Sequence, residues 1–297
     1  MLNLLTPSLY RKWIHPLVSN RFTYLFGMFL LRSARKARVK ANSLGSNSIE
    51  QVVIQNYAGS IRMQVDKNSY MGGSIYWSGY HHLNECLFLD SILKQNMTFV
   101  DVGANQGEFT LFAAQRLVNG KVIAFEPVET NLKALKTNVS LNNFSNVVVE
   151  PFGLFNEEKK LPVYTSFDQE LNGGRHEGLS TIYPDQYRSE IEETISLKVF
   201  DDLYFNQLER FDFLKIDIEG AELYALQGMK ESLKKFHPII LIEISTETVK
   251  NAGYSADELV QFLIELGYHP HSLFRGKLIK EKNLAISSWG NFVFIPQ

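Results

Sequence analysis

Acidic and glycine residues directly follow several apolar stretches of the chain, where they could contact a bound small molecule. In FVDVGANQGEFT, Gly103 and Gly107 enclose a turn, Asp101 precedes it and Asn105 lies within it. The next apolar stretch ends in FEP and contributes Glu126. An acidic residue about 20 positions past such a turn is placed to accept hydrogen bonds from ribose hydroxyls. These residues therefore predict a nucleoside-binding site.

The glycine turn departs from the G-x-G-x-x-G pattern of dinucleotide-binding loops. Asn105 occupies the position of the second glycine, and Glu108 occupies that of the third. The Glu108 carboxylate would repel a pyrophosphate at the start of the following helix. A ligand with a ribose and an amino-acid part but no phosphate fits better, with Asp101 or Glu108 contacting its ammonium group.

A second acidic group follows the stretches FDFLKID and IILIEIS. It contains Asp217, Glu219 and Glu222 in DIEGAE, and Glu243. A carboxylate here could remove the proton of an acceptor group, and Asp217 is the preferred catalytic residue. Glu222 also suits the first turn of a helix, as a partner of the helix dipole, and for Glu243 a substrate contact and a structural role are both open. Close carboxylates also attract Mg²⁺ or Ca²⁺, but we predict no metal site.

Histidines offer an alternative base. His81 and His82 follow Gly79-Tyr80, and imidazole titrates near neutral pH. Adjacent histidines cannot share a face, and a surface or partly packed position is the competing interpretation. His176 lies in LNGGRHEGLST, a segment expected to form a mobile lid over the acceptor site. In that segment Ser180 and Thr181 either bind acceptor hydroxyls or occupy turn and strand positions.

The elements that must position these residues alternate along the chain from Thr98 onward. FVDV, KVIAFEP, NVVVEPFG, FDFLKID, IILIEIS and NFVFIP have the pattern of buried strands, and helical patterns separate most of them. Strands that are apolar on both faces and alternate with helices predict an α/β fold with a parallel sheet covered on both sides. Ligands of such sheets bind beyond the carboxyl ends of the strands, where the acidic residues fall.

Four stretches resemble the FkbM family of S-adenosylmethionine-dependent methyltransferases: FVDVGANQGEFT, VIAFEPVETNLKALKTNVSLNN, FDFLKIDIEGAELYALQGM and PIILIEIS. DIEGAE after LK is the most specific of these motifs, and the resemblance covers roughly residues 80–296. It implies a class I methyltransferase Rossmann-like sandwich with a mostly parallel seven-stranded sheet. The last strand, NFVFIP, would be reversed. The implied reaction is transfer of a methyl group to a hydroxyl of a sugar, glycoconjugate or natural product.

The resemblance also assigns residues to the S-adenosylmethionine site. The assigned positions are Asp101, Gly103, Asn105, Gly107, Glu126 and Phe152. The first four would surround the methionine part of the donor, and Glu126 would bind the ribose. Phe152 belongs to EPFGL, which would border the adenine. Two rival functions remain open at this point, an NAD-dependent oxidoreductase and a non-catalytic nucleoside-binding module.

The amino-acid composition of the chain limits the kinds of molecule that it is expected to bind and the compartment that it suits. The formal net charge is −2, so no overall positive field favours nucleic acid, and we expect a small-molecule or glycan acceptor instead. The single cysteine, Cys86, excludes an internal disulfide framework and fits a reducing, cytoplasmic location. The sequence does not indicate an oligomeric state.

The N-terminal region differs from the rest. Residues 1–40 hold eight Lys and Arg and no acidic residue, which leaves a net charge of −10 for the remainder. The apolar run FTYLFGMFLL is too short to span a bilayer. No small-residue cleavage site follows it, so we do not expect it to be a signal peptide. Its helix either packs on the main domain or makes a peripheral contact with the inner face of a membrane. The expected organisation is an arm over 1–48, a hairpin and helix over 49–97, and a methyltransferase domain over 98–297.

Overall fold

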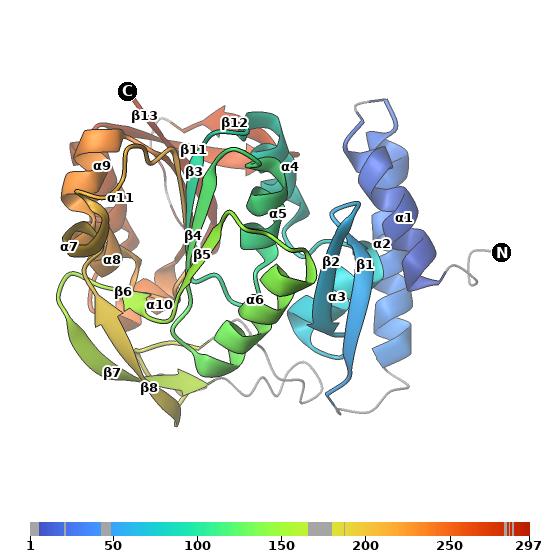
Figure 1. Cartoon of the computed structure of the whole chain (residues 1–297), viewed down its shortest axis with the longest axis horizontal. Helices are drawn as coiled ribbons and strands as arrows, with labels where there is room; N and C mark the ends of the chain where they lie inside the picture. The colour runs from blue at the N-terminus through green and yellow to red at the C-terminus, as the bar shows by residue number, and fades with distance from the viewer. Residues whose placement is uncertain are drawn as a thin grey trace. The chain divides into compact units, whose positions relative to one another are not determined.

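The protein is represented by a computed structural model (Figure 1). The described residues are 6–20, 22–42, 49–165, 180–186, 188–281, 284, 286 and 288–297. They fall into two compact units. The first contains the described residues up to Leu83 together with 137–143, and the second contains 84–136 and the described residues from Phe144 onward.

The first unit combines helices with a small hairpin. Its elements are α1 (Pro7–Val18), α2 (Tyr24–Asn42), β1 (Gln51–Tyr57), β2 (Ile61–Asp66) and α3 (Tyr70–Ser78). β1 and β2 pair antiparallel, so the hairpin expected from the sequence is present. Helix α3 begins after Ser69, whose hydroxyl oxygen accepts a hydrogen bond from the Gly72 N–H and so satisfies one of the free donors of the first turn.

The second unit is built around an eight-stranded sheet with the order β12-β11-β13-β10-β9-β3-β4-β5. The strands are β3 (Thr98–Val102), β4 (Lys121–Phe125), β5 (Val147–Glu150), β9 (Phe213–Ile216), β10 (Ile239–Ser245), β11 (Tyr268–Phe274), β12 (Lys277–Lys280) and β13 (Trp289–Pro296). Neighbours from β5 through β10 are parallel, whereas β13 is antiparallel to β10 and β11. The predicted fold class, with its reversed NFVFIP strand, is confirmed.

Two strands at one edge are not evident from the sequence pattern. β11 reads YHPHSLF, in which only Tyr268 and Pro270 are buried, so it lacks the long apolar run of the central strands. β12 pairs with β11 and is exposed at every position. The resemblance implies seven strands, and β12 is an additional eighth strand at the edge.

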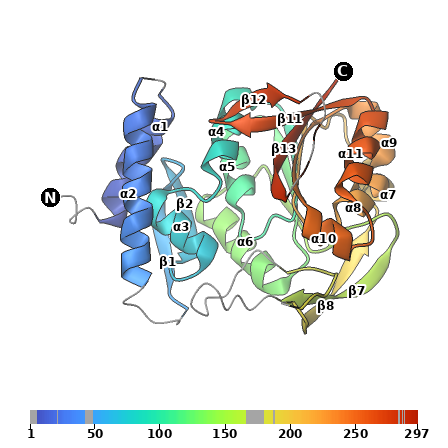
Figure 2. The ribbon, with the colours of Figure 1, turned by 180° about the vertical axis from the view of Figure 1, so that it is seen from behind.

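Helices cover both faces of the sheet (Figures 1 and 2). They are α4 (Leu83–Ile92), α5 (Glu108–Arg116), α6 (Glu129–Leu141), α7 (Phe200–Tyr204), α8 (Glu222–Gly228), α9 (Lys230–Phe236), α10 (Thr246–Asn251) and α11 (Ala256–Glu265). α4 and α5 lie on one side, and α8, α9 and α11 lie on the other. Leu226, Leu233 and Leu259 from this second layer are fully buried in the main hydrophobic core. A capping box of Ser255 and Glu258 begins α11.

A three-stranded sheet accompanies the main one and was not predicted. It has the order β6-β8-β7, with β6 (Gly153–Leu154), β7 (Lys159–Thr165) and β8 (Glu190–Lys198). β7 and β8 read KKLPVYT and EIEETISLK, so charged residues interrupt the apolar pattern. Only a few of their side chains, including Val163 and Ile195, are buried. Such strands resemble polar loops in sequence because their stability depends on cross-strand partners.

The strand register determines which residues meet at the edge of the main sheet. Val102 pairs with Phe125 on one side and with Ile216 on the other, and Ile216 pairs with Ile242. These four residues therefore lie level with one another across parallel strands. The residues that follow them directly emerge side by side at the carboxyl edge: Gly103, Glu126, Asp217 and Glu243.

Candidate functional site

The loop after β3 requires glycine at its first position. Gly103 has a φ angle of 76°, and a Cβ added there would lie 2.0 Å from the backbone oxygen of Asp217. Both Gly103 and Ala104 donate backbone hydrogen bonds to the Phe125 carbonyl. The absence of a side chain thus allows the loops after β3, β4 and β9 to approach one another closely.

Two further residues of this loop adopt left-handed backbone conformations. Asn105 has a φ angle of 51°, which Asn tolerates better than most residues, and Gly107 has a φ angle of 99°. A Cβ at Gly107 would lie 2.8 Å from Leu135 Cδ1, so glycine also permits α6 to pack closely. The Asn105 N–H donates a hydrogen bond of 2.7 Å to Glu126 Oε2. The loop is therefore attached directly to the predicted ribose ligand.

Glu126 is buried and partly satisfied by the backbone. Its Oε2 accepts from Asn105 and its Oε1 accepts a 3.0 Å hydrogen bond from the Val128 N–H. Burial raises the pKa of Glu126 to about 7, although both backbone bonds oppose the shift. An ionised carboxylate has about four acceptor positions, so about two remain for further donors. This capacity matches the pair of hydroxyls on a ribose.

Lys215 lies at the centre of the site although it belongs to a buried strand. Its ammonium donates a 2.9 Å hydrogen bond to the Gly103 carbonyl and lies 3.7 Å from a carboxylate oxygen of Asp101 and of Asp217. Burial alone would lower the pKa of Lys215, but nearby carboxylates, that of Asp217 first, raise it above its ordinary value. The carboxylates that do so are those of Asp217, Asp101, Glu243 and Glu126.

Asp101 is positioned differently from the open ligand that the sequence predicts. Its side chain is fully buried, and Oδ2 accepts a 2.6 Å hydrogen bond from the Thr110 hydroxyl. Oδ1 has no hydrogen-bond partner and faces Lys215 across 3.7 Å. Burial raises the pKa of Asp101, and Lys215 opposes the shift. The structure thus gives Asp101 a charge-balancing position, and its contact with the donor stays a prediction.

The loop after β9 is shaped by one glutamate. The carboxylate of Glu222, the first residue of α8, accepts hydrogen bonds from the N–H groups of Ile218 and Gly220. It also contacts the Tyr254 hydroxyl at 3.3 Å. Glu219 and Gly220 both have positive φ angles, 53° and 106°, so the chain turns sharply here. Glu222 therefore has the structural role that its place in the first helical turn indicates.

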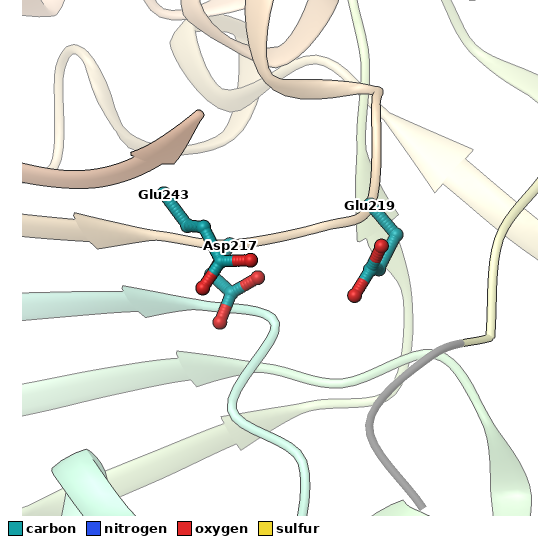
Figure 3. Close-up of side chains that lie close together, drawn as sticks. All are labelled: Asp217, Glu219 and Glu243. Carbon is teal, nitrogen blue, oxygen red and sulfur yellow. The ribbon is translucent and has the colours of Figure 1, made fainter. Parts of the chain in front are cut away.

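Three carboxylates converge beside this loop (Figure 3). Oxygen atoms of Asp217, Glu219 and Glu243 all lie within 4.8 Å of one another. Arg188 donates a 3.1 Å hydrogen bond to Glu219 and is itself held by Asp185. Burial raises the pKa of Glu219 to about 8, with Asp217 adding to the shift and Arg188 opposing it. The side chain of Asp217 is more exposed than that of Glu219: 26% of the Asp217 side chain is exposed, compared with 10% for Glu219.

The same three carboxylates are oxygen ligands of the type that Mg²⁺ and Ca²⁺ prefer. Among the residues that the structure describes, they form a group that could share one cation. Lys215 and Arg188 already bring positive charge to Asp217 and Glu219. These protein cations compete electrostatically with a divalent ion, and the absence of a metal stays a prediction.

Phe152, predicted to border the adenine, follows β5. Its ring lies 5.7 Å from the Phe125 ring, and Lys198 Nζ lies 4.4 Å from its centroid. Phe152 is 7% exposed, so most of its surface belongs to the core. Glu150, two residues earlier, pairs with Phe125 at the end of β4, so Phe152 follows the same carboxyl edge of the sheet, and its role there stays a prediction.

The predicted histidines do not all fall within the same part of the structure. His81 and His82 belong to the first unit, where their rings contact each other at 4.3 Å and His81 contacts Tyr70. Their catalytic role stays a prediction. His176 and most of the expected lid lie outside the described residues. Thr181 is buried and donates to the Glu219 carbonyl, and Ser180 donates to Glu192.

Sequence reasoning missed Lys215 and Arg188 as parts of the site. Lys215 carries a recognisable signal, because a charged residue within the apolar run FLKI must find a charged partner if the strand is buried on both faces. Arg188 carries no such signal. Its link to Glu219 joins segments 31 positions apart and becomes visible only in the folded chain.

Comparisons with known proteins agree with this geometry. The chain matches the Methyltransferase FkbM domain over residues 101–270. Methyltransferase sdnD of Sordaria araneosa is 31% identical over 186 residues, and the match covers 54% of this chain and 70% of that protein. AMB antimetabolite synthetase AmbE of Pseudomonas aeruginosa is 27% identical over 207 residues, and the match covers 60% of this chain but only 10% of the synthetase.

A solved structure is also similar. The crystal structure of Methyltransferase FkbM from Methylobacillus flagellatus KT aligns with a TM-score of 0.44 and 20% sequence identity. The alignment covers 69% of this chain and 44% of that chain.

The first prediction concerns Glu126. Replacement by Gln keeps the shape but removes the charge that should attract the ribose hydroxyls, at a cost of about 1.5–3 kcal/mol. We expect Glu126→Gln to bind S-adenosylhomocysteine about 10- to 150-fold more weakly by calorimetry, while the exposed control Glu129→Gln binds normally. Unchanged affinity in Glu126→Gln would remove Glu126 from the donor site.

The second prediction concerns pH. Since the pKa of Glu126 is about 7 and its ionised form is the better acceptor, donor affinity should rise as pH increases through that value. Between about pH 6 and pH 8 the ionised fraction changes roughly tenfold, and the affinity for S-adenosylhomocysteine should change similarly. Glu126→Gln should show a flatter profile. An equally steep profile in this variant would assign the effect to another group.

The third prediction concerns Lys215. Lys215→Met would leave the buried Asp101 carboxylate without its cation, and breaking a buried pair costs about 3–5 kcal/mol of unfolding free energy. The deficit relative to wild type should shrink as pH falls, because burial raises the pKa of Asp101 and a proton can then neutralise the carboxylate that the variant leaves without its cation. Denaturant unfolding at about pH 5 and pH 8, with Lys230→Met as the surface control, measures both effects. A deficit independent of pH would refute this charge balance.

Proposed function

The chain belongs to the FkbM family of methyltransferases, and we propose that it transfers the methyl group to a hydroxyl of a sugar, glycoconjugate or natural product. Family membership makes it an S-adenosylmethionine-dependent methyltransferase. This replaces the rival oxidoreductase and non-catalytic interpretations of the glycine turn.

The residues at one part of the carboxyl edge of the main sheet suit S-adenosylmethionine, the methyl donor. Glu126 would hold the ribose with its free acceptor positions, and the loop from Gly103 to Gly107 would surround the methionine part. Phe152 would border the adenine. When bound, the donor supplies an electrophilic methyl carbon, so the protein's contribution is to orient an acceptor and to accept its proton.

The acceptor chemistry rests on the carboxylates beside this donor region. Asp217 directly follows Ile216, which is level with Val102, the residue before the Gly103 loop. A hydroxyl placed against Asp217 would donate its hydrogen bond to the carboxylate and pass the proton to it, as its oxygen bonds to the methyl carbon and the bond from that carbon to the donor sulfur breaks, which would leave S-adenosylhomocysteine. Glu219 and Glu243 could orient the acceptor, because adjacent hydroxyls can each donate to a carboxylate. This convergence of carboxylates is the observation that supports O-methylation most directly.

Two arguments support a hydroxylated acceptor: the chemistry of the carboxylate group and the name of one similar protein. Several carboxylate oxygens close together suit a molecule with several hydroxyls, such as a sugar or a hydroxylated natural product. The similar segment of AmbE lies within an antimetabolite synthetase, which supports a natural-product acceptor as one form of this proposal. The chain outside residues 1–40 has a net charge of −10, which disfavours nucleic acid as the acceptor.

A cytoplasmic location completes the proposal. The single cysteine, Cys86, is buried, and one cysteine without an internal disulfide framework suits a protein in a reducing compartment.

Methyl transfer with a labelled donor tests the proposal. The wild-type chain would be incubated with S-adenosylmethionine carrying an isotopic methyl group and with panels of sugars, glycoconjugates and hydroxylated natural products. Mass spectrometry should place the label on an oxygen atom. Label found only on nitrogen or carbon atoms of the same acceptors, or no transfer to any of them while donor binds, would contradict this proposal.

The fourth prediction concerns Asp217. Asp217→Asn retains the shape but removes the charge and most of the basicity, so kcat should fall about 100-fold or more with little change in donor affinity. Single-turnover transfer to an identified acceptor measures this, with Asp202→Asn on the exposed surface as control. Turnover near the wild-type level would exclude Asp217 as the base and favour His81, His82 or Glu243.

In the same assay, treatment with a chelator distinguishes a role of Asp217 as the base from a role as a metal ligand. If Asp217 acts without a metal, treatment with chelator should leave wild-type turnover unchanged. Loss of activity with chelator and its recovery with added Mg²⁺ would instead assign Asp217, Glu219 and Glu243 to a cation.

A further inference from the structure

Helix α2 exposes a row of large apolar side chains. Phe22, Leu25, Phe26 and Phe29 are 95%, 73%, 58% and 48% exposed. Leu25, Phe26 and Phe29 share one face of α2 by their spacing, and Phe22 lies two residues before the helix begins. Isolated exposed apolar residues are common, but a contiguous apolar row marks a surface that is covered by a partner.

This row does not serve to pack the helix within its own unit. The buried residues of α2 include Gly27, Leu30, Leu31 and Ala34, which lie on the opposite face. A Cβ at Gly27 would approach Val18 Cγ1 to 2.8 Å, so the absence of a side chain allows α1 and α2 to pack closely. Packing therefore accounts for one apolar face of α2 and leaves the other unexplained.

Basic residues extend the exposed row. Arg32 and Lys36 follow Phe29 by three and seven positions and are exposed, so they continue the same face. Helix α1 has a similar exposed set consisting of Leu9, Lys12 and Trp13. With no Asp or Glu among residues 1–40, both helices present aromatic and positively charged groups without neighbouring negative charge.

We propose that the exposed row formed by Phe22 and by the residues of α2 from Leu25 to Lys36 binds the surface of an anionic lipid bilayer, assisted by Leu9, Lys12 and Trp13 of α1. Aromatic and aliphatic side chains enter the boundary between headgroups and acyl chains, and Arg and Lys attract anionic headgroups. Among the described helices none is long and apolar enough to cross a bilayer, so the contact is with one surface. This binding is separate from methyl transfer.

A second copy of the chain is the competing occupant. Pairing two such rows would bury the apolar residues but would bring two strongly basic helices together. Residues 1–40 supply no acidic group to offset that repulsion. An anionic lipid surface satisfies both the apolar and the charged part of the row.

Vesicle sedimentation with the full-length chain tests the proposal. Wild type should bind vesicles of phosphatidylcholine mixed with phosphatidylglycerol at least about tenfold more strongly than vesicles of phosphatidylcholine alone. Raising the salt concentration to about 0.5 M should weaken binding, because it screens the charge contribution. Phe26→Ser/Phe29→Ser and, independently, Arg32→Glu/Lys36→Glu should each reduce binding to the anionic vesicles about tenfold or more.

Matched variants in the second unit provide the controls. Phe274→Ser removes another exposed aromatic side chain, and Lys277→Glu/Lys280→Glu reverses two exposed charges of β12. Both should bind vesicles like wild type, and all variants should retain the wild-type unfolding midpoint. Absence of wild-type binding, or equal losses in row and control variants, would overturn the proposal. A different outcome would assign the row to self-association. In that case the wild type would be oligomeric, the Phe26→Ser/Phe29→Ser variant would be monomeric, and both would bind vesicles equally.

Discussion

A buried ammonium group, that of Lys215, is the interaction on which the candidate site depends. It binds the carbonyl of Gly103 and balances the carboxylates of Asp101 and Asp217. An isolated charge in a sheet core would be prohibitively costly, so Lys215 and its carboxylates each require the other. The loop expected to hold the donor and the residue expected to act on the acceptor therefore share one electrostatic centre.

The sequence predicts the features whose signals are local. The central strands are short apolar runs, and the glycines at 103 and 107 occur where positive φ angles and close approaches require them. Glu126 follows β4 at the spacing expected of a ribose ligand, and the structure shows it bound to the loop through Asn105. For Glu222 the sequence allowed either a role in the acidic group or a structural role in the first turn of a helix. Its hydrogen bonds to the DIEGAE backbone favour the structural role.

Features that depend on distant segments were not predicted. Strand β8 is rich in glutamate and gains its strand conformation from pairing with β7, and Arg188 reaches Glu219 only after the chain has folded back on itself. Asp101 looks like an accessible ligand in the sequence, yet the fold buries it completely against Thr110 and Lys215. In each case the deciding contact joins residues whose separation along the chain is too large for a local pattern.

In the proposed mechanism, two carboxylates at one edge of the sheet have separate functions: Glu126 would recognise the donor and Asp217 would activate the acceptor. A crystal structure of the chain with S-adenosylhomocysteine bound tests this arrangement most directly. The account predicts both ribose hydroxyls within hydrogen-bond distance of Glu126, with the sulfur atom directed toward Asp217. A nucleoside bound away from Glu126, or a sulfur atom remote from Asp217, would contradict it.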